Sequence, residues 1–209
     1  MFYAFFHGLF FIVSTLCFRL KVIGRSNIPK KGGVILASNH ISYLDPPIIG
    51  CSIWRRVHYM AKEELFRHPV LRFFITRWQA FPVKRGGMDR AALKKAIEIV
   101  LQGEVLLMFP EGTRSSTGEL QEGKLGVGMI AVKSKGVIIP TLIQGTDKIL
   151  PRGKRFPRLN RVLIKFGKPI YIDQITHEGP SKELYIKVST LIMEKIRELK
   201  QEVLDENKR

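Results

Sequence analysis

The chain has 209 residues, 45% of them hydrophobic, which suits one globular domain and excludes a largely disordered chain. Its 35 lysines and arginines outnumber its 18 acidic residues and give a formal net charge of +17. Such an excess predicts an anionic partner, namely a nucleic acid, an anionic membrane surface or a phosphorylated substrate. Cys17 and Cys51 lack the spacing of a metal site or a disulfide framework, so we expect neither.

The first 18 residues are almost wholly apolar and carry no charged side chain. A signal peptide would have a basic start and a small-residue cleavage site, and the segment has neither. Its length lies at the lower limit for a membrane-spanning helix, about 17–25 residues, and equally suits a helix lying in the interface. A buried core helix is the remaining alternative. We predict a membrane-associated helix over 1–18, spanning or interfacial, followed by one domain over 19–209.

Strands and helices are expected to alternate through the rest of the chain. Apolar or alternating runs predict strands at 18–23, 34–38, 57–61, 79–83, 104–109 and 137–143. Helical periodicity predicts helices at 62–76, with a break near His68-Pro69, and at 89–102, 126–135 and 181–200. This alternation is typical of α/β proteins, and we predict a single α/β domain with a mixed, mostly parallel β-sheet flanked by helices.

The stretch 148–168 is basic throughout and contains no acidic residue. We expect a surface loop there. It is either merely solvated or a patch for anionic lipid headgroups or an acidic carrier.

The stretch Asn39–Asp45 follows a predicted buried strand, which is where open α/β sheets usually bind ligands. His40 can accept a proton near neutral pH, and a nearby carboxylate such as Asp45 can fix its tautomer and stabilise the imidazolium. Because an α-helix advances about 100° per residue, residues five positions apart do not share a helix face. We therefore predict that the chain turns before Pro46 and brings the two side chains within hydrogen-bond reach. By itself, the pair also fits a core histidine beside a helix cap formed by Asp45.

No serine or cysteine in this stretch is placed as an enzyme nucleophile, so a catalytic pair would activate a hydroxyl of the substrate. Two further strand ends carry cations. Arginine offers planar, bidentate donors that suit phosphate. The candidate residues in these two segments are Lys84, Arg85, Glu111, Gly112 and Arg114. A fourth segment, 137–140, is apolar and is expected to form a wall.

Four motifs in this order resemble those of the glycerolipid acyltransferases, and within that family the lysophosphatidic acid acyltransferases. They are Asn39-His40-x4-Asp45, Phe81–Gly86, Phe109–Ser115 and Val137–Pro140, and the resemblance covers about 29–145. It implies that His40 is the general base for the free sn-2 hydroxyl of 1-acylglycerol-3-phosphate and that Asp45 orients it. The hydroxyl would attack the thioester of acyl-CoA or acyl-carrier protein without an acyl-enzyme and give phosphatidic acid.

The resemblance also implies roles for the other motif residues. The acceptor phosphate would be bound by Lys84, Arg85, Glu111, Gly112 and Arg114, with Lys124 as a weaker addition, and the acyl side would be lined by Val137, Ile138, Ile139 and Pro140. It implies no cofactor or metal. The implied partners are a phospholipid membrane surface, a lysophospholipid and the acyl donor, at the cytoplasmic face of the cell membrane.

Two alternatives stay open at this stage. Lys84 occupies a position where many relatives carry an acid, so the acceptor is open between the lysophosphatidic acid and glycerol-3-phosphate, a lysophosphatidylglycerol or an amino-acid lipid. The alternative of a different class is a non-catalytic basic protein that binds membranes or nucleic acid. We expect no nucleic-acid partner, because the aromatic residues that would stack on bases cluster in the apolar N-terminal segment.

Overall fold

The computed structural model describes residues 2–84, 87–151, 156–175, 179–206 and 208. Their strands are β1 (Lys21–Ile23), β2 (Val34–Ser38), β3 (Val57–Lys62), β4 (Ala80–Val83), β5 (Val105–Met108), β6 (Val137–Gln144) and β7 (Leu163–Phe166). Their helices are α1 (Phe2–Phe18), α2 (Asp45–Cys51), α3 (Pro69–Arg77), α4 (Arg90–Leu101), α5 (Leu125–Ser134), α6 (Thr146–Ile149) and α7 (Lys182–Glu206). Short 3₁₀ helices are η1 (Arg25–Asn27), η2 (Glu63–Phe66) and η3 (Ile172–Gln174).

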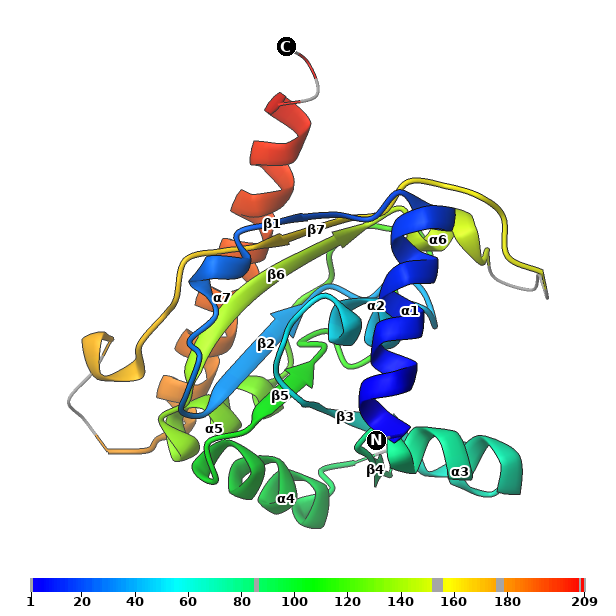
Figure 1. Ribbon diagram of the computed structural model, residues 1–209. Coiled ribbons are helices and arrows are strands. Elements are labelled where there is room, and N and C mark those ends of the chain that lie inside the picture. Colours follow the sequence, from blue (N-terminus) through cyan, green and yellow to red (C-terminus); the bar gives the residue numbers. More distant parts are fainter. Residues whose placement is uncertain (1, 85–86, 152–155, 176–178, 207, 209) are drawn as a thin grey trace.

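The seven strands form one sheet in the order β1-β7-β6-β2-β5-β3-β4, with helices on both sides (Figure 1). From β6 to β4 all neighbouring strands are parallel, while β7 runs antiparallel to β6. The predicted α/β domain with a mixed, mostly parallel sheet is confirmed. The central strand, β2, pairs with β6 on one side and β5 on the other. The loops after these three strands therefore meet at one edge of the sheet.

Strand β2 is buried on both faces, as expected of a strand in a covered parallel sheet. Ile35 and Ala37 point into a core shared with α4, α5 and α7. Val34 and Leu36 point into the opposite core, which includes residues of α2. The uninterrupted apolar run thus reflects burial between two helical layers, and it holds the His40 loop on a rigid support.

The apolar N-terminal segment forms α1, which packs against α2 beside the sheet (Figure 1). The imidazole Nε2 of His7 lies 2.9 Å from the carbonyl oxygen of Ile53, and the backbone N–H of Val57 donates to the Tyr3 hydroxyl. The outer side of α1 remains exposed and apolar, so α1 is not a buried core helix. Within the described ranges, no helix combines the length and the apolar character needed to cross a bilayer.

Three element predictions are wrong in detail. The strand expected over 18–23 begins only at Lys21, because α1 continues to Phe18 and Arg19 then takes a left-handed conformation with φ 44°. The helix expected to end at 200 continues to Glu206. The basic stretch 148–168, expected to be a loop, contains β7, in which Lys165 is nearly buried and binds carboxylates of α7. Within that stretch, residues 152–155 lie outside the described part of the chain.

Candidate active site

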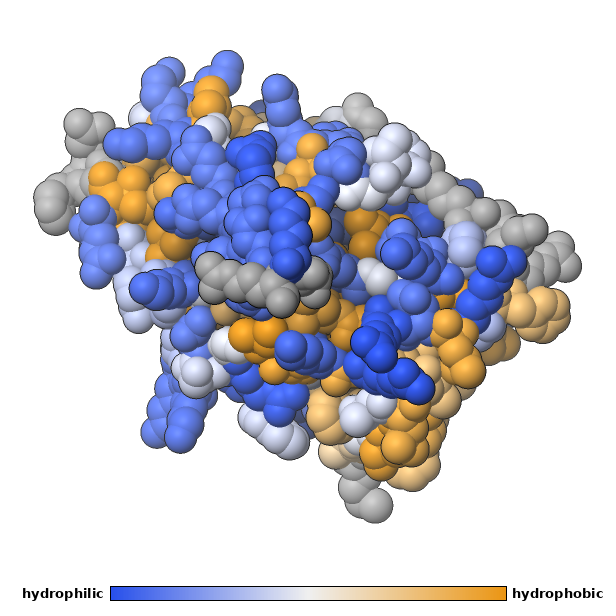
Figure 2. Space-filling model, turned by 90° about the horizontal axis from the view of Figure 1, so that it is seen from above, coloured by the Kyte–Doolittle hydropathy of each residue, from blue (hydrophilic) through white to orange (hydrophobic). Residues whose placement is uncertain are grey.

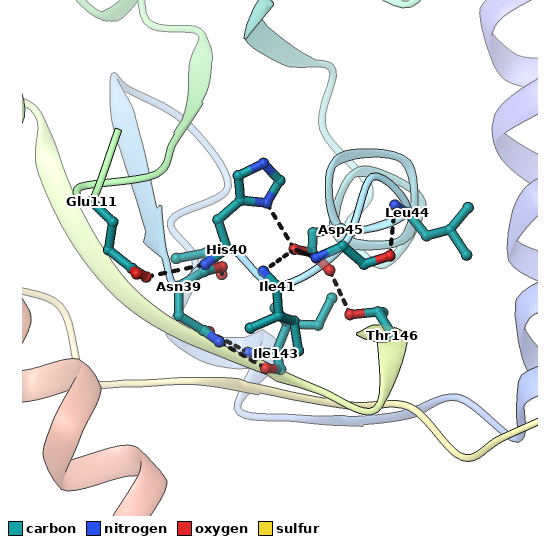
Figure 3. A network of polar contacts seen from close by, with 10 residues as sticks. Asn39, His40, Ile41, Leu44, Asp45, Glu111, Ile143 and Thr146 are labelled. Carbon is teal, nitrogen blue, oxygen red and sulfur yellow. Dashed lines mark hydrogen bonds and ion pairs between the residues drawn. The ribbon is translucent and has the colours of Figure 1, made fainter. Parts of the chain in front are cut away.

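His40 and Asp45 form a hydrogen-bonded pair just beyond the end of β2 (Figure 3). The distance from His40 Nδ1 to Asp45 Oδ2 is 2.8 Å, so the hydrogen bond predicted from the five-residue spacing is present. The histidine side chain keeps 13% of its surface exposed, whereas the aspartate side chain is fully buried. Figure 3 shows the second ring nitrogen of His40, Nε2, on the side of the ring away from Asp45. A solvated molecule can therefore approach the imidazole but not the carboxylate.

Four donors hold the Asp45 carboxylate in place. Besides the His40 ring, Oδ2 accepts the backbone N–H groups of Ile41 at 2.7 Å and Ser42 at 2.8 Å. Oδ1 accepts the hydroxyl of Thr146 at 2.5 Å, and that side chain is also fully buried. These four hydrogen bonds fix the position of the carboxylate beside the imidazole.

The expectation that Asp45 caps the following helix is wrong. Asp45 is the first residue of α2, its side chain makes no capping bond, and Leu44 is the N-cap residue. Its carboxylate instead accepts N–H groups of the preceding turn. Proline does lie in the first turn of α2, where no backbone donor is lost.

The turn that carries His40 is anchored from both sides. Asn39 is buried, and its side-chain amide exchanges two hydrogen bonds with the backbone of Ile143 in β6, at 2.8 and 3.0 Å. On the side of β5, the N–H of Ser115 donates to the His40 carbonyl at 2.8 Å. The Phe109 ring stacks on the imidazole with centroids 3.9 Å apart and planes inclined by 17°. The orientation of His40 is thus set by both neighbouring strands.

Glu111, one of the candidate phosphate-binding residues, is buried and bonded to the backbone of the His40 turn. It is 1% exposed, and its two carboxylate oxygens accept the backbone N–H groups of His40 at 3.2 Å and Gln121 at 3.3 Å. Burial raises its pKa, as does the nearby charge of Asp45 to a smaller degree, while the two N–H donors act against that rise. Glu111 therefore ties the motif after β5 to the backbone of His40, and its predicted contact with the phosphate stays a prediction.

Arg114, Gly112 and Lys124 lie in the same loop region after β5. The guanidinium carbon of Arg114 is 3.4 Å from the ring centroid of Tyr43, a stacked cation–π arrangement. Gly112 has φ 69°, and a Cβ on it would lie 2.9 Å from the Lys124 side chain. Glycine thus allows both the turn and the close approach of the exposed Lys124.

Lys84 is separated from this region. Lys84 follows β4 at the edge of the sheet, and its backbone N–H donates to Asp89, which also caps α4. Neighbouring strands lie about 4.8 Å apart, so β4, three strands from β2, is on the order of 14 Å away. Arg85 lies outside the described residues, so its predicted role stays a prediction.

The segment predicted to line the acyl side forms the first half of β6. Ile138 and Ile139 are fully buried on opposite faces of the sheet, and Pro140 pairs with Ala37 of β2. Their side chains fill the core beneath the site, and a direct acyl contact stays a prediction.

Sequence reasoning missed Thr146. Its hydroxyl reaches Asp45 from 101 positions away, because the parallel pairing of β6 with β2 brings the start of α6 beside the His40 turn. No local pattern marks this residue. The only available signal was a Gly-Thr pair directly after a strong buried strand.

The known proteins that resemble this chain are acyltransferases. A family model described as Acyltransferase matches residues 19–144. The 1-acyl-sn-glycerol-3-phosphate acyltransferase of Bacillus subtilis is 30% identical over 189 residues, which cover 90% of this chain and 92% of that protein. The chloroplastic enzyme LPAT1 of Arabidopsis thaliana is 29% identical over 79% of this chain, which spans only 48% of that longer protein. The crystal structure of PlsC, the 1-acyl-sn-glycerophosphate acyltransferase from Thermotoga maritima, aligns with a TM-score of 0.76 at 29% identity, over 94% of this chain and 79% of that one.

Proposed function

This chain belongs to the acyltransferase family, and we propose that it acylates the sn-2 hydroxyl of 1-acylglycerol-3-phosphate with His40 as the general base. The acyl group comes from the thioester of acyl-CoA or acyl-carrier protein, and the product is phosphatidic acid. The observation that carries this mechanism is the 2.8 Å hydrogen bond between the slightly exposed imidazole of His40 and the buried Asp45 carboxylate.

The pair acts through the nitrogen that faces away from Asp45. When Nδ1–H donates to the carboxylate, Nε2 carries the lone pair and accepts the proton of the lipid hydroxyl. The hydroxyl oxygen then attacks the thioester carbonyl carbon. When the carbon–sulfur bond breaks, the thiolate takes the proton back from the imidazolium, so a free thiol leaves. The buried charge of Asp45 stabilises the imidazolium between these two steps.

Direct transfer, without an acyl-enzyme, fits the environment of the nearby hydroxyl groups. Ser38 and Ser42, the serines closest to His40 in the chain, are fully buried. The Ser38 hydroxyl donates to the carbonyl of Asn39, and the Ser42 hydroxyl accepts the N–H of Leu44. Neither serine is presented to a thioester, so the attacking hydroxyl belongs to the acceptor.

The acceptor phosphate binds near Arg114. The motif that carries Arg114 is tied to the His40 turn by the Ser115 N–H bond and by Glu111, so this arginine belongs to a segment bonded directly to the turn of the base. In glycerol-3-phosphate lipids the phosphate is attached to the carbon next to sn-2, which suits one cation beside one base. Lys124 adds a second positive charge, and Lys84 supplies more distant charge at the sheet edge.

The reaction takes place at a membrane surface, because the acceptor and the product are lipids. The exposed apolar side of α1 provides the contact, aided by the net charge of +17, which attracts anionic lipids. Acyl-CoA and acyl-carrier protein are cytoplasmic donors, which places the enzyme on the cytoplasmic face of the cell membrane.

A panel of acceptors with both donors tests the proposal. Thiol release and lipid product are measured for 1-acylglycerol-3-phosphate, glycerol-3-phosphate and lysophosphatidylglycerol, with wild type, His40→Ala and the control His68→Ala. We expect 1-acylglycerol-3-phosphate to give the highest kcat/KM and His40→Ala to lose at least about 10²-fold, with His68→Ala unchanged. Preference for another acceptor would refute the substrate, and near-normal turnover by folded His40→Ala would refute the base.

A further inference from the structure

Helix α3 stands out because it contains no buried residue. Arg67 and His68 separate it from η2, and Pro69 is its first residue. The exposed apolar side chains along it are Val70, Leu71, Phe73 and Phe74. Leaving so many large apolar side chains in water is unfavourable by about 25 cal/mol per Å², so such a surface indicates a contact.

The apolar surface of α3 continues onto α1. Phe74 lies edge-on to Phe6 with ring centroids 6.0 Å apart, and Trp78, at the end of α3, lies edge-on to Phe10 at 4.9 Å. The exposed side of α1 is the stripe Phe5, Leu9, Ile12 and Leu16, spaced as one face of a helix. Figure 1 shows α3 beside the N-terminal end of α1, and Figure 2 shows hydrophobic residues gathered on the side where α1 lies.

A basic groove borders this apolar surface. It has a volume of about 380 Å³ and lies between η2 and α3, where Arg67, Arg72 and Arg77 line it together with Phe66 and Phe73. The guanidinium carbon of Arg77 is 3.6 Å from the ring centroid of Phe73, so the charge is held against the apolar side chains. The acidic residues of η2, Glu63 and Glu64, do not line the groove. Three guanidinium groups in one groove suit a phosphate, which arginine binds bidentately.

We propose that α3 is a second membrane-contact element and that its arginine groove binds the phosphate of an anionic phospholipid headgroup. The proposal rests on the membrane association of α1 proposed above and extends it to a separate element. With α3 in the interface, the two helices contact the bilayer at separate points, which fixes the tilt of the enzyme and not merely its attachment. The lipid bound here is a surface ligand, distinct from the acceptor that reaches His40.

An acidic carrier protein would also be attracted by three arginines, but the apolar composition of the surface favours lipid. Aromatic and aliphatic side chains next to arginines are typical of helices that lie at the boundary between headgroups and acyl chains. A protein docking site for a soluble acidic carrier would not need the continuous apolar stripe over two helices.

The two tryptophans of the chain allow a direct test of insertion. In a Trp54→Phe variant, Trp78 at the end of α3 is the sole fluorophore. We expect phospholipids brominated on the acyl chains, mixed into vesicles containing phosphatidylglycerol, to quench it. The matched control carries Trp54→Phe, Trp78→Phe and Ile186→Trp, which puts the only tryptophan at a half-exposed position of α7. It should bind the same vesicles without quenching.

The groove is tested by removing its charges. Arg67→Gln, Arg72→Gln and Arg77→Gln are combined and compared with Lys133→Gln, Lys182→Gln and Lys187→Gln, an equal change of net charge on exposed positions of α5 and α7. Each basic residue near an anionic bilayer contributes about a five-fold change in binding. The arginine variant should therefore bind phosphatidylglycerol vesicles on the order of 100-fold more weakly. The lysine variant should stay within about three-fold of wild type.

The outcomes separate this proposal from the one on which it rests. Binding of wild type without quenching of Trp78, or equal losses in both charge variants, would overturn the role of α3 and leave α1 as the contact. Failure of wild type to bind vesicles at all would overturn both proposals. A loss confined to transfer from acyl-carrier protein, with vesicle binding intact, would assign the arginines to the carrier and overturn the lipid site.

Discussion

Replacing Asp45 by asparagine separates the charge of the carboxylate from its geometry. The amide oxygen of asparagine can accept the three donors that now meet Oδ2, from His40, Ile41 and Ser42. The amide nitrogen then faces Thr146, whose hydroxyl can accept a hydrogen bond as well as donate one. The variant is therefore expected to fold with the imidazole in its present orientation and to lack only the negative charge.

The loss in rate follows from the burial of that charge. Asp45 is fully buried and its Oδ2 lies 2.8 Å from His40 Nδ1, so the centres of the two charges are roughly 4 Å apart when the imidazolium forms. At an effective dielectric constant of about 20, that ion pair is worth about 4 kcal/mol. Each 1.36 kcal/mol changes a rate about ten-fold, so kcat/KM should fall by about three orders of magnitude.

The assay follows thiol release from acyl-CoA with 1-acylglycerol-3-phosphate as acceptor, at saturating and limiting acceptor. The same substitution at exposed Asp173 is the matched control. The fall should be in kcat, with the Michaelis constant for the acceptor nearly unchanged, because the carboxylate does not touch the lipid. If Asp45→Asn keeps activity within ten-fold of wild type while folded, the imidazolium is not what the carboxylate stabilises, and the reasoning fails.

Three further predictions concern the surroundings of the pair. Thr146→Val leaves one oxygen of buried Asp45 without its hydroxyl donor. It should lower the free energy of unfolding by about 1.5–3 kcal/mol in urea titrations, whereas Thr146→Ser should stay close to wild type. Equal losses in both variants would refute the role of the hydroxyl. Gly112→Ala forces a φ of 69° on alanine and places a Cβ 2.9 Å from the Lys124 side chain. The Michaelis constant for the acceptor should therefore rise several-fold, with little change in that for acyl-CoA. A larger change in the Michaelis constant for the donor would contradict this. Because burial raises the pKa of Glu111, the folded chain retains a proton there that the unfolded chain releases, and stability relative to Glu111→Gln should fall as the pH rises from about 4.5 through the raised pKa. A constant difference between the two unfolding free energies across that range would show that burial does not perturb Glu111.

The parts of the site predicted from sequence are those encoded by neighbouring residues. His40 and Asp45 are five positions apart, and proline follows at once, so a turn within one short segment is enough to join them. The buried strand before them needed only its apolar run.

The sequence by itself therefore determined the α/β class, the order of the motifs and the pairing of His40 with Asp45. The tertiary structure alone decided what surrounds that pair. Thr146 and Ile143 reach the His40 turn only through the pairing of β6 with β2, and Glu111 reaches the His40 backbone only through the pairing of β5 with β2. Contacts between residues so distant in the chain follow from strand order. Strand order is set by the packing of the whole core, so it cannot be predicted from the local spacing of residues.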